Sequence, residues 1–382
     1  MGTRVALVHD YLNQNGGAEK VLEVIHDQFP AAPVYTSIYA PELMPAAYRT
    51  WQIHTSFMQH LPFIHRHHQP YLMLYPAAFE RFRLDGYDLV FSSSSAFAKG
   101  VHVPHDVPHI CYCHSPMRFV WDFERYAERE RMNGLARRIL PLFLKHMRQW
   151  DLESARRVDR FIANSTTVAR RIKDYWGRDS EVIYPPVDID LMQPAAAGEV
   201  GDYYLLVSRL VPYKRFDIAI DAFNVLGLPL KIIGSGRARE DLERRAGPNV
   251  EFLGFVSDEE KRRLFAHCKA AIFPAEDDFG IAQVEVQAAG RPVIALGAGG
   301  ALDTVVDGVT GVLFQPQTPE GVIEAVRRFD TIAFSTDEIV RRAKRFSRGR
   351  FERDIARIVD QSLAERTAQP VRSTTEATVS WN

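Results

Sequence analysis

The chain has 382 residues, a formal net charge of −1, and hydrophobic and charged contents of 46% and 25%. This length suits two domains, and the composition is that of an ordinary globular protein. The near-neutral charge gives no reason to expect a nucleic acid partner. No apolar run reaches the roughly 18 residues of a membrane-spanning helix, and residues 1–12 lack the apolar core of a signal peptide. Three cysteines, an odd number at low density, favour a reducing compartment, so we expect the protein in the cytoplasm.

The first predicted strand, residues 4–8, runs into a loop with Gly16 and Gly17 and then into a helix that ends near Phe29. A strand, a glycine loop and a helix in this order can cradle a phosphate, because the helix N-terminus offers free backbone N–H groups. The spacing is not that of a dinucleotide fingerprint, so a simple tight turn is the alternative. A second strand is predicted at residues 34–38.

Residues 51–79 are rich in aromatic residues and histidine, and their spacing predicts short helices with an apolar face. That face can belong to the core, or part of it can contact a lipid. Ten of the thirteen histidines lie between His54 and His146, where Lys and Arg outnumber Asp and Glu. This segment can form a basic face for an anionic partner or a solvated surface of mixed charge.

Two further strands, residues 87–91 and 108–113, end in polar side chains. Four serine hydroxyls at residues 92–95 follow the first strand, and His114 directly follows the second. In a doubly wound sheet His114 faces the crevice at the carboxyl ends of the strands. A structural histidine, bonded inside the fold, is the alternative.

Residues 119–157 have helical periodicity, and their part at 135–150 is amphipathic and basic. Such a helix can lie on an anionic membrane surface or pack on the core of its own domain. In the first case the protein would be peripheral at the inner face of the plasma membrane. Short strands are predicted next at residues 159–163 and 181–184.

The second half of the chain repeats the alternation of strands and helices, after a boundary indicated by two prolines at 185–186 and the soft segment 193–201. The predicted strands are residues 203–207, 228–233, 250–252, 271–273, 292–296 and 312–314. From Thr367 onward the sequence is unpatterned, and we expect a disordered tail.

The loops that follow these strands are polar or rich in glycine. They carry Arg209 and Lys214, then Gly234 and Gly236, then Gly254 and Phe255, then residues 276–281 (Glu276, Asp277, Asp278, Phe279, Gly280, Ile281) with Glu285, and lastly the glycines of 297–300. In one parallel sheet all of these loops face the same crevice. Arg209 can fork onto phosphate oxygens and Lys214 adds a point charge, so the pair matches a diphosphate. The carboxylate of Glu285 can accept two vicinal ribose hydroxyls. Each residue taken singly can also be an ordinary surface side chain.

The segment SRLVPYK (208–214), the later Gly-Ser-Gly, and two acids separated by seven residues resemble the retaining glycosyltransferases of family four. The segments HSPMRFVWD (114–122) and FSSSSAFAKG (91–100) are similar to the bacterial mannosyltransferases of this family that build surface polysaccharides. The resemblance covers residues 3–365. It implies an α/β protein of GT-B fold, with two doubly wound Rossmann-like parallel-sheet domains facing across a cleft.

The implied domains are an acceptor-side domain at 1–186, a nucleotide-sugar donor domain at 187–345, a helix at 346–366 that crosses back to the first domain, and the tail at 367–382. The resemblance also implies residue roles. Arg209 and Lys214 would bind the donor diphosphate and help it leave, and Gly17 would approach the phosphates. Glu285 would hold the ribose, and Asp277 would hold hydroxyls of the transferred sugar. The amides of Gly280 and Ile281 after Phe279 would lie against sugar and phosphate, and His114 would contact the transferred sugar and stabilise the reaction centre. Gly234, Gly254 and Phe255 complete the expected donor site, the last two near the base. The family usually has Glu at the position of Asp277, so Glu276 is an alternative for the sugar contact.

The expected activity is transfer of a hexose, mannose from GDP-mannose, to a glycan or lipid-linked glycan acceptor with retention at the anomeric carbon. We expect no cofactor and no metal, since Asp188-Ile189-Asp190 lies in the linker and no other Asp-x-Asp stands at a strand end. Two alternatives are another GT-B enzyme, such as a sugar-nucleotide epimerase or a glucosyltransferase using UDP- or ADP-glucose, and a non-catalytic nucleotide-sugar binding protein.

Overall fold

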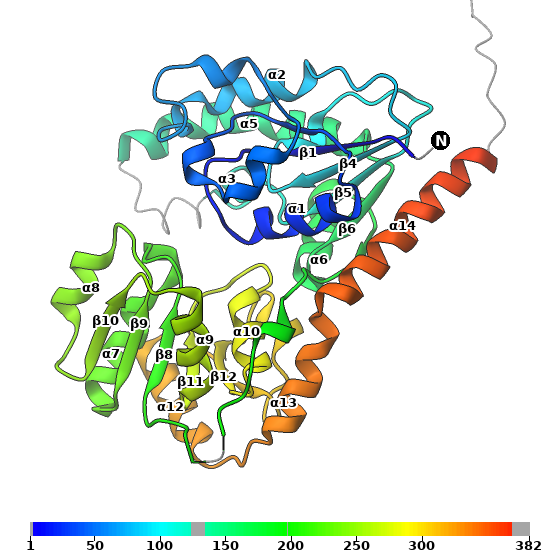
Figure 1. Ribbon diagram of the computed structural model, residues 1–382. Helices are drawn as coiled ribbons and strands as arrows, with labels where there is room; N and C mark the ends of the chain where they lie inside the picture. The colour runs from blue at the N-terminus through cyan, green and yellow to red at the C-terminus, as the bar shows by residue number, and fades with distance from the viewer. Residues whose placement is uncertain (1–2, 124–133, 197, 369–382) are drawn as a thin grey trace, which may run out of the picture.

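The computed structural model describes residues 3–123, 134–196 and 198–368, and these form two α/β domains that face each other (Figure 1). The first domain contains a seven-stranded sheet of order β3-β2-β1-β4-β5-β6-β7, and the second a six-stranded sheet of order β10-β9-β8-β11-β12-β13. The strand pairings within both sheets are parallel. The predicted fold of two Rossmann-like domains is confirmed.

The strands of the first sheet are β1 (Val5–His9), β2 (Val34–Thr36), β3 (Ile53–Thr55), β4 (Leu89–Ser94), β5 (His109–Cys113), β6 (Arg160–Ala163) and β7 (Ser180–Val182). The helices of this domain are α1 (Gly17–Gln28), α2 (Tyr75–Glu80), α3 (Arg118–Trp121), α5 (Gly134–Arg156) and α6 (Thr166–Trp176), with short 3₁₀ turns η1 (Pro41–Leu43), η2 (Ala46–Thr50), η3 (Phe57–His60), η4 (Gln69–Leu74) and η5 (Ala98–Gly100). β1, β4 and β5 are buried along their whole length, as expected for the centre of a sheet covered on both faces.

The strands of the second sheet are β8 (Tyr204–Val207), β9 (Leu230–Ile233), β10 (Val250–Gly254), β11 (Ala270–Phe273), β12 (Val293–Leu296) and β13 (Gly311–Phe314). Its helices are α7 (Phe216–Leu226), α8 (Arg239–Arg245), α9 (Asp258–His267), α10 (Ile281–Ala288), α11 (Ala301–Thr304), α12 (Pro319–Phe329) and α13 (Thr336–Ala343), with 3₁₀ turns η6 (Ile189–Leu191), η7 (Pro212–Lys214) and η8 (Lys344–Phe346). In each sheet the chain starts at a central strand, moves out to one edge, and returns to the other side. The switch points therefore lie between β1 and β4 and between β8 and β11, where open α/β sheets bind ligands.

The last helix, α14 (Arg348–Ala368), returns from the second domain to the first, as Figure 1 shows. Phe351, Ile355 and Ile358 are buried in the core that β1, β4 and α1 share. Where the chain re-enters the first domain it runs beside the outgoing linker, because Val187 and Ser347 form an isolated parallel bridge.

Several sequence expectations need correction or fall outside the described residues. The segment 51–79 contains the expected short helices, but it begins with a strand, β3, which is short, half-buried and at the sheet edge. The helical prediction at 119–157 holds for α3 and α5, while residues 124–133 lie outside the described part. The side chains of 134–142 lie outside it too, so the side chains of half of the expected membrane-facing segment 135–150 are not described. Thr367 still belongs to α14, and the tail from residue 369 is outside the description.

The three cysteines, Cys111, Cys113 and Cys268, are free and buried. Among the described helices, none combines the length and the apolar character that crossing a membrane requires.

Candidate functional site

Two neighbouring cavities of about 450 Å³ and 370 Å³ lie where the two switch points face each other. Both are lined by Ser95 and His114 from the first domain and by Tyr213, Asp277 and Asp278 from the second. These shared residues mark the boundary between the cavities. The larger cavity extends over the loop of residues 14–19, and its second-domain side carries Arg209, Lys214, Phe279, Gly280 and Ile281.

Two cations line the larger cavity on the second-domain side. Arg209 is in the loop after β8, and its Nη2 lies 3.0 Å from the hydroxyl of Tyr213. Lys214 ends the turn η7, and its Nζ lies 2.5 Å from Oδ1 of Asp277. Lys214 and Asp277 are both mostly buried, so each charge is balanced by the other.

The three carboxylates of the acidic turn after β11 differ in their partners. Asp277 lines both cavities. Asp278 forms ion pairs with Arg118 and Arg171 of the first domain, and Oε1 of Glu276 lies 2.7 Å from Nη2 of Arg171. Burial alone would raise the pKa of Asp278, but the two guanidinium groups outweigh it and hold this pKa below its ordinary value. Glu276 and Asp278 thus join the domains, and Asp277 is the acid of the three whose partner is the cavity-lining Lys214.

Glycines fix the backbone of this acidic turn. The amide of Gly300 donates a hydrogen bond of 2.8 Å to the carbonyl of Asp277. A Cβ on Gly299 would lie 2.3 Å from that same carbonyl oxygen, and a Cβ on Gly300 would lie 2.2 Å from the Cα of Phe279. The glycine loop at 297–300 therefore packs directly against the backbone of the acidic turn, where side chains on Gly299 or Gly300 would displace that turn.

Two helix N-termini meet across the larger cavity. α1 begins at Gly17 in the first domain and α10 begins at Ile281 in the second, and both residues line the cavity. A Cβ on Gly17 would lie 3.0 Å from Cδ1 of Ile281, so the missing side chain permits this approach. Free N–H groups at both ends create a positive field that suits an anion.

Five expected donor-site residues do not line the larger cavity, namely Gly234, Gly254, Phe255, Glu276 and Glu285. Gly234 supports the Arg209 loop instead, because its Cβ would lie 1.9 Å from the carbonyl oxygen of Ser208. Phe255 is 90% exposed beyond the end of β10. Glu285 lines a smaller adjoining cavity of about 70 Å³, with Lys20 Nζ at 3.5 Å and Lys261 Nζ at 3.7 Å. Their assignment to ligand contacts stays a prediction.

His114 lines both cavities and is also bonded inside the fold. Its Nε2 lies 2.8 Å from Oγ of Ser93 in β4, and the residue is only 8% exposed. Burial lowers the pKa of His114 to about 3, with a further lowering from His9, while Asp278 acts in the opposite direction. The imidazole is therefore neutral at physiological pH, and both sequence interpretations of His114 describe part of its environment.

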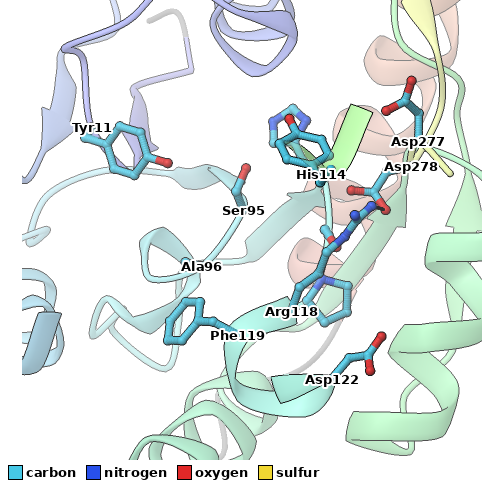
Figure 2. Close-up of a pocket in the computed structure, with 12 residues that line it drawn as sticks. Tyr11, Ser95, Ala96, His114, Arg118, Phe119, Asp122, Asp277 and Asp278 are labelled. Carbon is cyan, nitrogen blue, oxygen red and sulfur yellow. Dashed lines mark hydrogen bonds and ion pairs between the residues drawn. The ribbon is translucent and has the colours of Figure 1, made fainter. Parts of the chain in front are cut away.

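The smaller of the two main cavities is lined on its first-domain side by aromatic and charged side chains (Figure 2). Tyr11 comes from the loop after β1, and Arg118, Phe119 and Asp122 come from α3 and its end. Sequence reasoning did not single these residues out, although Arg118, Phe119 and Asp122 stand in the segment 114–122 that carried the family resemblance. Within the described residues no group of three or more His, Cys, Asp or Glu side chains could hold a metal ion.

Two parallel-sheet domains with one cleft between their switch points define the GT-B class of folds. Two family models match this chain, Glycosyltransferase Family 4 over residues 15–191 and Glycosyl transferases group 1 over residues 201–330. The first match falls in the domain of β1–β7 and the second in the domain of β8–β13. Each of the two domains is thus similar to a glycosyltransferase domain model, the first to that of family four.

Curated relatives include the O-antigen chain mannosyltransferase C of Escherichia coli, 31% identical over 40% of this chain and 43% of the relative. The D-inositol 3-phosphate glycosyltransferase of Geodermatophilus obscurus is 30% identical over 44% of this chain and 45% of the relative. The alpha-1,3/1,6-mannosyltransferase ALG2 of Dictyostelium discoideum is 30% identical over 34% and 38%. The matched part thus spans less than half the length of each of these relatives.

Solved structures agree on the fold along nearly the whole chain. HepE of Anabaena in complex with UDP superposes with a TM-score of 0.70 at 20% identity, covering 94% of this chain and 100% of that chain. The sucrose-phosphate synthase of Thermosynechococcus elongatus gives 0.71 at 16% identity, with coverage of 95% and 100%. At these identities the likeness concerns the fold.

Proposed function

We propose that this protein transfers a hexose from a nucleotide-sugar donor to a hydroxyl of a glycan acceptor, with retention at the anomeric carbon. The observation that carries this proposal is the larger cavity, where Arg209, Lys214 and two helix N-termini face Asp277 and His114. Cations and amides suit a diphosphate, and a carboxylate and a neutral imidazole suit the hydroxyls of a sugar.

The donor we propose is GDP-mannose. The mannosyltransferases among the relatives support this choice, at about 30% identity over part of the chain. UDP-glucose and ADP-glucose are the competing donors, since relatives also include glycogen synthases.

The chemistry assigned to the chain is electrostatic. As the bond between the anomeric carbon and the phosphate oxygen breaks, negative charge develops on the diphosphate, and Arg209, Lys214 and the amides at the start of α10 stabilise it. Lys214 would then exchange part of its contact with Asp277 for the phosphate. A departing phosphate oxygen can accept the proton of the attacking hydroxyl, so no separate protein base is required. The facing domains exclude water and so limit hydrolysis.

The acceptor is proposed to occupy the smaller cavity, because that cavity meets the larger one at His114 and Asp277. Tyr11 and Phe119 offer ring faces, and Asp122 and Arg118 offer polar groups, which together suit a pyranose with its hydroxyls. A lipid-linked glycan in surface polysaccharide assembly is the acceptor class that we propose, with the enzyme acting at the cytoplasmic side of the membrane.

A panel of nucleotide sugars tests the donor. A donor present at about 100 times its dissociation constant should raise the free energy of unfolding by about 2.7 kcal/mol. We expect thermal stabilisation by GDP-mannose and by GDP, and stabilisation by UDP-glucose alone would overturn the donor assignment.

Release of the nucleoside diphosphate tests the reaction class. A transferase releases it when an acceptor glycan is present, whereas an epimerase would act on the donor alone. We expect Arg209→Ala and Lys214→Ala to abolish most of this release. Full activity of both variants would contradict the catalytic role and favour a binding protein.

A further inference from the structure

A row of buried side chains connects the N-terminal end of α1 to His114. Oε1 of Glu19 lies 3.5 Å from Nε2 of His9, Nδ1 of His9 lies 3.1 Å from Oγ of Ser93, and Oγ of Ser93 lies 2.8 Å from Nε2 of His114. Glu19, His9 and Ser93 are each at most 2% exposed. Side chains from α1, β1 and β4 thus form one row, whose last member, Ser93, contacts a ring nitrogen of His114.

The order of protons along this row follows from what each group can donate. Glu19 as a carboxylate can only accept, and its Oε2 already accepts from the amide of Gly16 at 2.8 Å. His9 therefore donates from Nε2. Nδ1 of His9, the ring nitrogen without a proton in this tautomer, then accepts from the hydroxyl of Ser93.

Because the Ser93 hydroxyl donates its proton to Nδ1 of His9, its oxygen accepts a hydrogen bond from Nε2–H of His114. A neutral His114 carries one ring proton, so its Nδ1 keeps a free lone pair. Burial keeps His114 neutral, since it lowers the pKa of this group to about 3. A doubly protonated His9 would reverse the whole row and place the His114 proton on Nδ1.

We propose that Glu19, His9 and Ser93 are positioning residues that hold His114 in the Nε2–H tautomer, so that Nδ1 accepts a hydrogen bond from a hydroxyl of the transferred sugar. The part that concerns the sugar rests on the proposed function. The same carboxylate of Glu19 holds the Gly16 amide in the loop that faces the expected phosphates. Glu19 therefore orders the phosphate loop and the sugar-binding histidine together.

The chain offers a matched control pair one residue away. Oγ of Ser92 lies 2.8 Å from Nε2 of His109, and both residues are fully buried. Since successive strand residues point to opposite faces of a sheet, this pair lies on the other face of β4, and neither residue lines the two cavities. Ser92→Ala removes a buried serine–histidine hydrogen bond of equal length without touching the row.

Nitrogen NMR of the protein labelled with ¹⁵N-histidine tests the tautomer directly, because the protonated and unprotonated ring nitrogens resonate far apart. The His114 signals are assigned by their loss in His114→Gln. We expect the Nε2–H pattern in the unsubstituted protein and in Ser92→Ala, and a mixture of tautomers in Ser93→Ala. An Nδ1–H pattern in the unsubstituted protein, or an unchanged pattern in Ser93→Ala, would overturn the proposal.

Steady-state kinetics with the donor identified by the panel test the consequence. Loss of one well-oriented hydrogen bond predicts a fall in kcat of about 10-fold for Ser93→Ala and His9→Gln, with the donor dissociation constant nearly unchanged. Ser92→Ala should keep the original kcat. Equal kcat values for Ser92→Ala and Ser93→Ala would contradict the positioning role. If no nucleotide sugar is turned over, the proposed function fails, while the NMR result still decides whether the row sets the tautomer.

Discussion

Asp277 and Glu276 are adjacent carboxylates with different surroundings. Asp277 lines both cavities beside Lys214, whereas Glu276 is paired with Arg171 of the other domain. Of the two, the shorter side chain of Asp277 therefore lies in the cavity where we propose that the sugar binds.

The first prediction compares these two acids. Asp277→Asn should lower kcat/KM by about 10- to 100-fold, because a hydrogen bond to a charged acceptor contributes about 1.5–3 kcal/mol. Glu276→Gln keeps the size of the side chain and should lower kcat/KM much less. Initial rates over a range of donor concentrations, which give kcat/KM, check this, and a larger loss in Glu276→Gln would assign the sugar contact to Glu276.

The second prediction concerns pH and stability. Burial lowers the pKa values of His109 and His114 to about 3, from an ordinary 6.5. Between these values the unfolded chain binds protons that the folded chain does not, so stability is complete above pH 6.5 and falls as the pH decreases below it. Each group should cost about 1.4 kcal/mol per pH unit in that window.

Urea unfolding at pH 7.5 and pH 5.5 measures this dependence. His109→Gln removes one of the two titrating groups, the one that lies outside the cavities, and should make the pH dependence of the free energy of unfolding shallower. An identical slope in this variant would show that His109 does not contribute to it.

Among single residues, the sequence predicted Arg209, Lys214 and Asp277 as neighbours, because each follows a strand of one parallel sheet and such strand ends meet at one edge. His114 follows a strand of the other sheet, and its place beside them was implied by the family resemblance. It did not predict Arg171, which pairs with acids 105 and 107 positions away in the chain. That contact arises only when the two domains are placed together, and no local pattern marks it.

Among the elements, the loop after β8 depends on the loop after β9. Leu210 N donates to Ser235 O at 2.8 Å, and Ala238 N donates to Leu210 O at 3.0 Å. Gly234 has a φ of +133°, and its Cα faces the Ser208 carbonyl without room for a side chain. The Gly-Ser-Gly motif thus supports the backbone of the loop that carries Arg209.

The third prediction follows from this contact. Gly234→Ala should lower the free energy of unfolding by more than about 1–3 kcal/mol, since backbone strain and overlap with Ser208 add. Gly227→Ala is the control, because Gly227 also has a positive φ, +67°, but a Cβ there meets nothing within 4 Å. Thermal unfolding and nucleoside diphosphate affinity should both suffer more in Gly234→Ala, and equal effects would exclude a role for the close approach.

The elements that sequence patterns predicted best are the buried central strands, because a short, continuous apolar run is typical of a parallel strand covered on both faces. β3 was missed for the opposite reason. It has three half-buried residues, one of them His54, and it is held mainly by pairing with β2 at the sheet edge. Its pairing is a tertiary effect that the local sequence does not encode.

For the whole molecule, the ion pairs of Arg118 and Arg171 with Asp278, together with Arg171 and Glu276, bridge the two domains beside the cavities. These side chains are between 17% and 26% exposed, so water screens them less than it screens surface pairs. They favour the state in which the two domains are close.

The fourth prediction tests this bridge. Arg171→Ala should shift the population toward more open molecules, raising the radius of gyration in small-angle scattering and weakening donor binding by about 10-fold, the factor that corresponds to 1.4 kcal/mol. Lys173→Ala on the same helix removes an exposed pair with Asp179 and should leave both quantities unchanged. Equal scattering from the two variants would rule out the bridge as a determinant of closure.

The chain leaves the first domain at Val187 and re-enters it at Ser347, and these two residues are bridged. The second domain is therefore one uninterrupted insertion whose two ends lie side by side. Such a unit can be exchanged by recombination when its two adjoining junctions match and the acids that pair with Arg118 and Arg171 are kept. In evolutionary terms, the half of the cleft that carries Arg209 and Lys214 can be replaced while the half that carries His114 is kept.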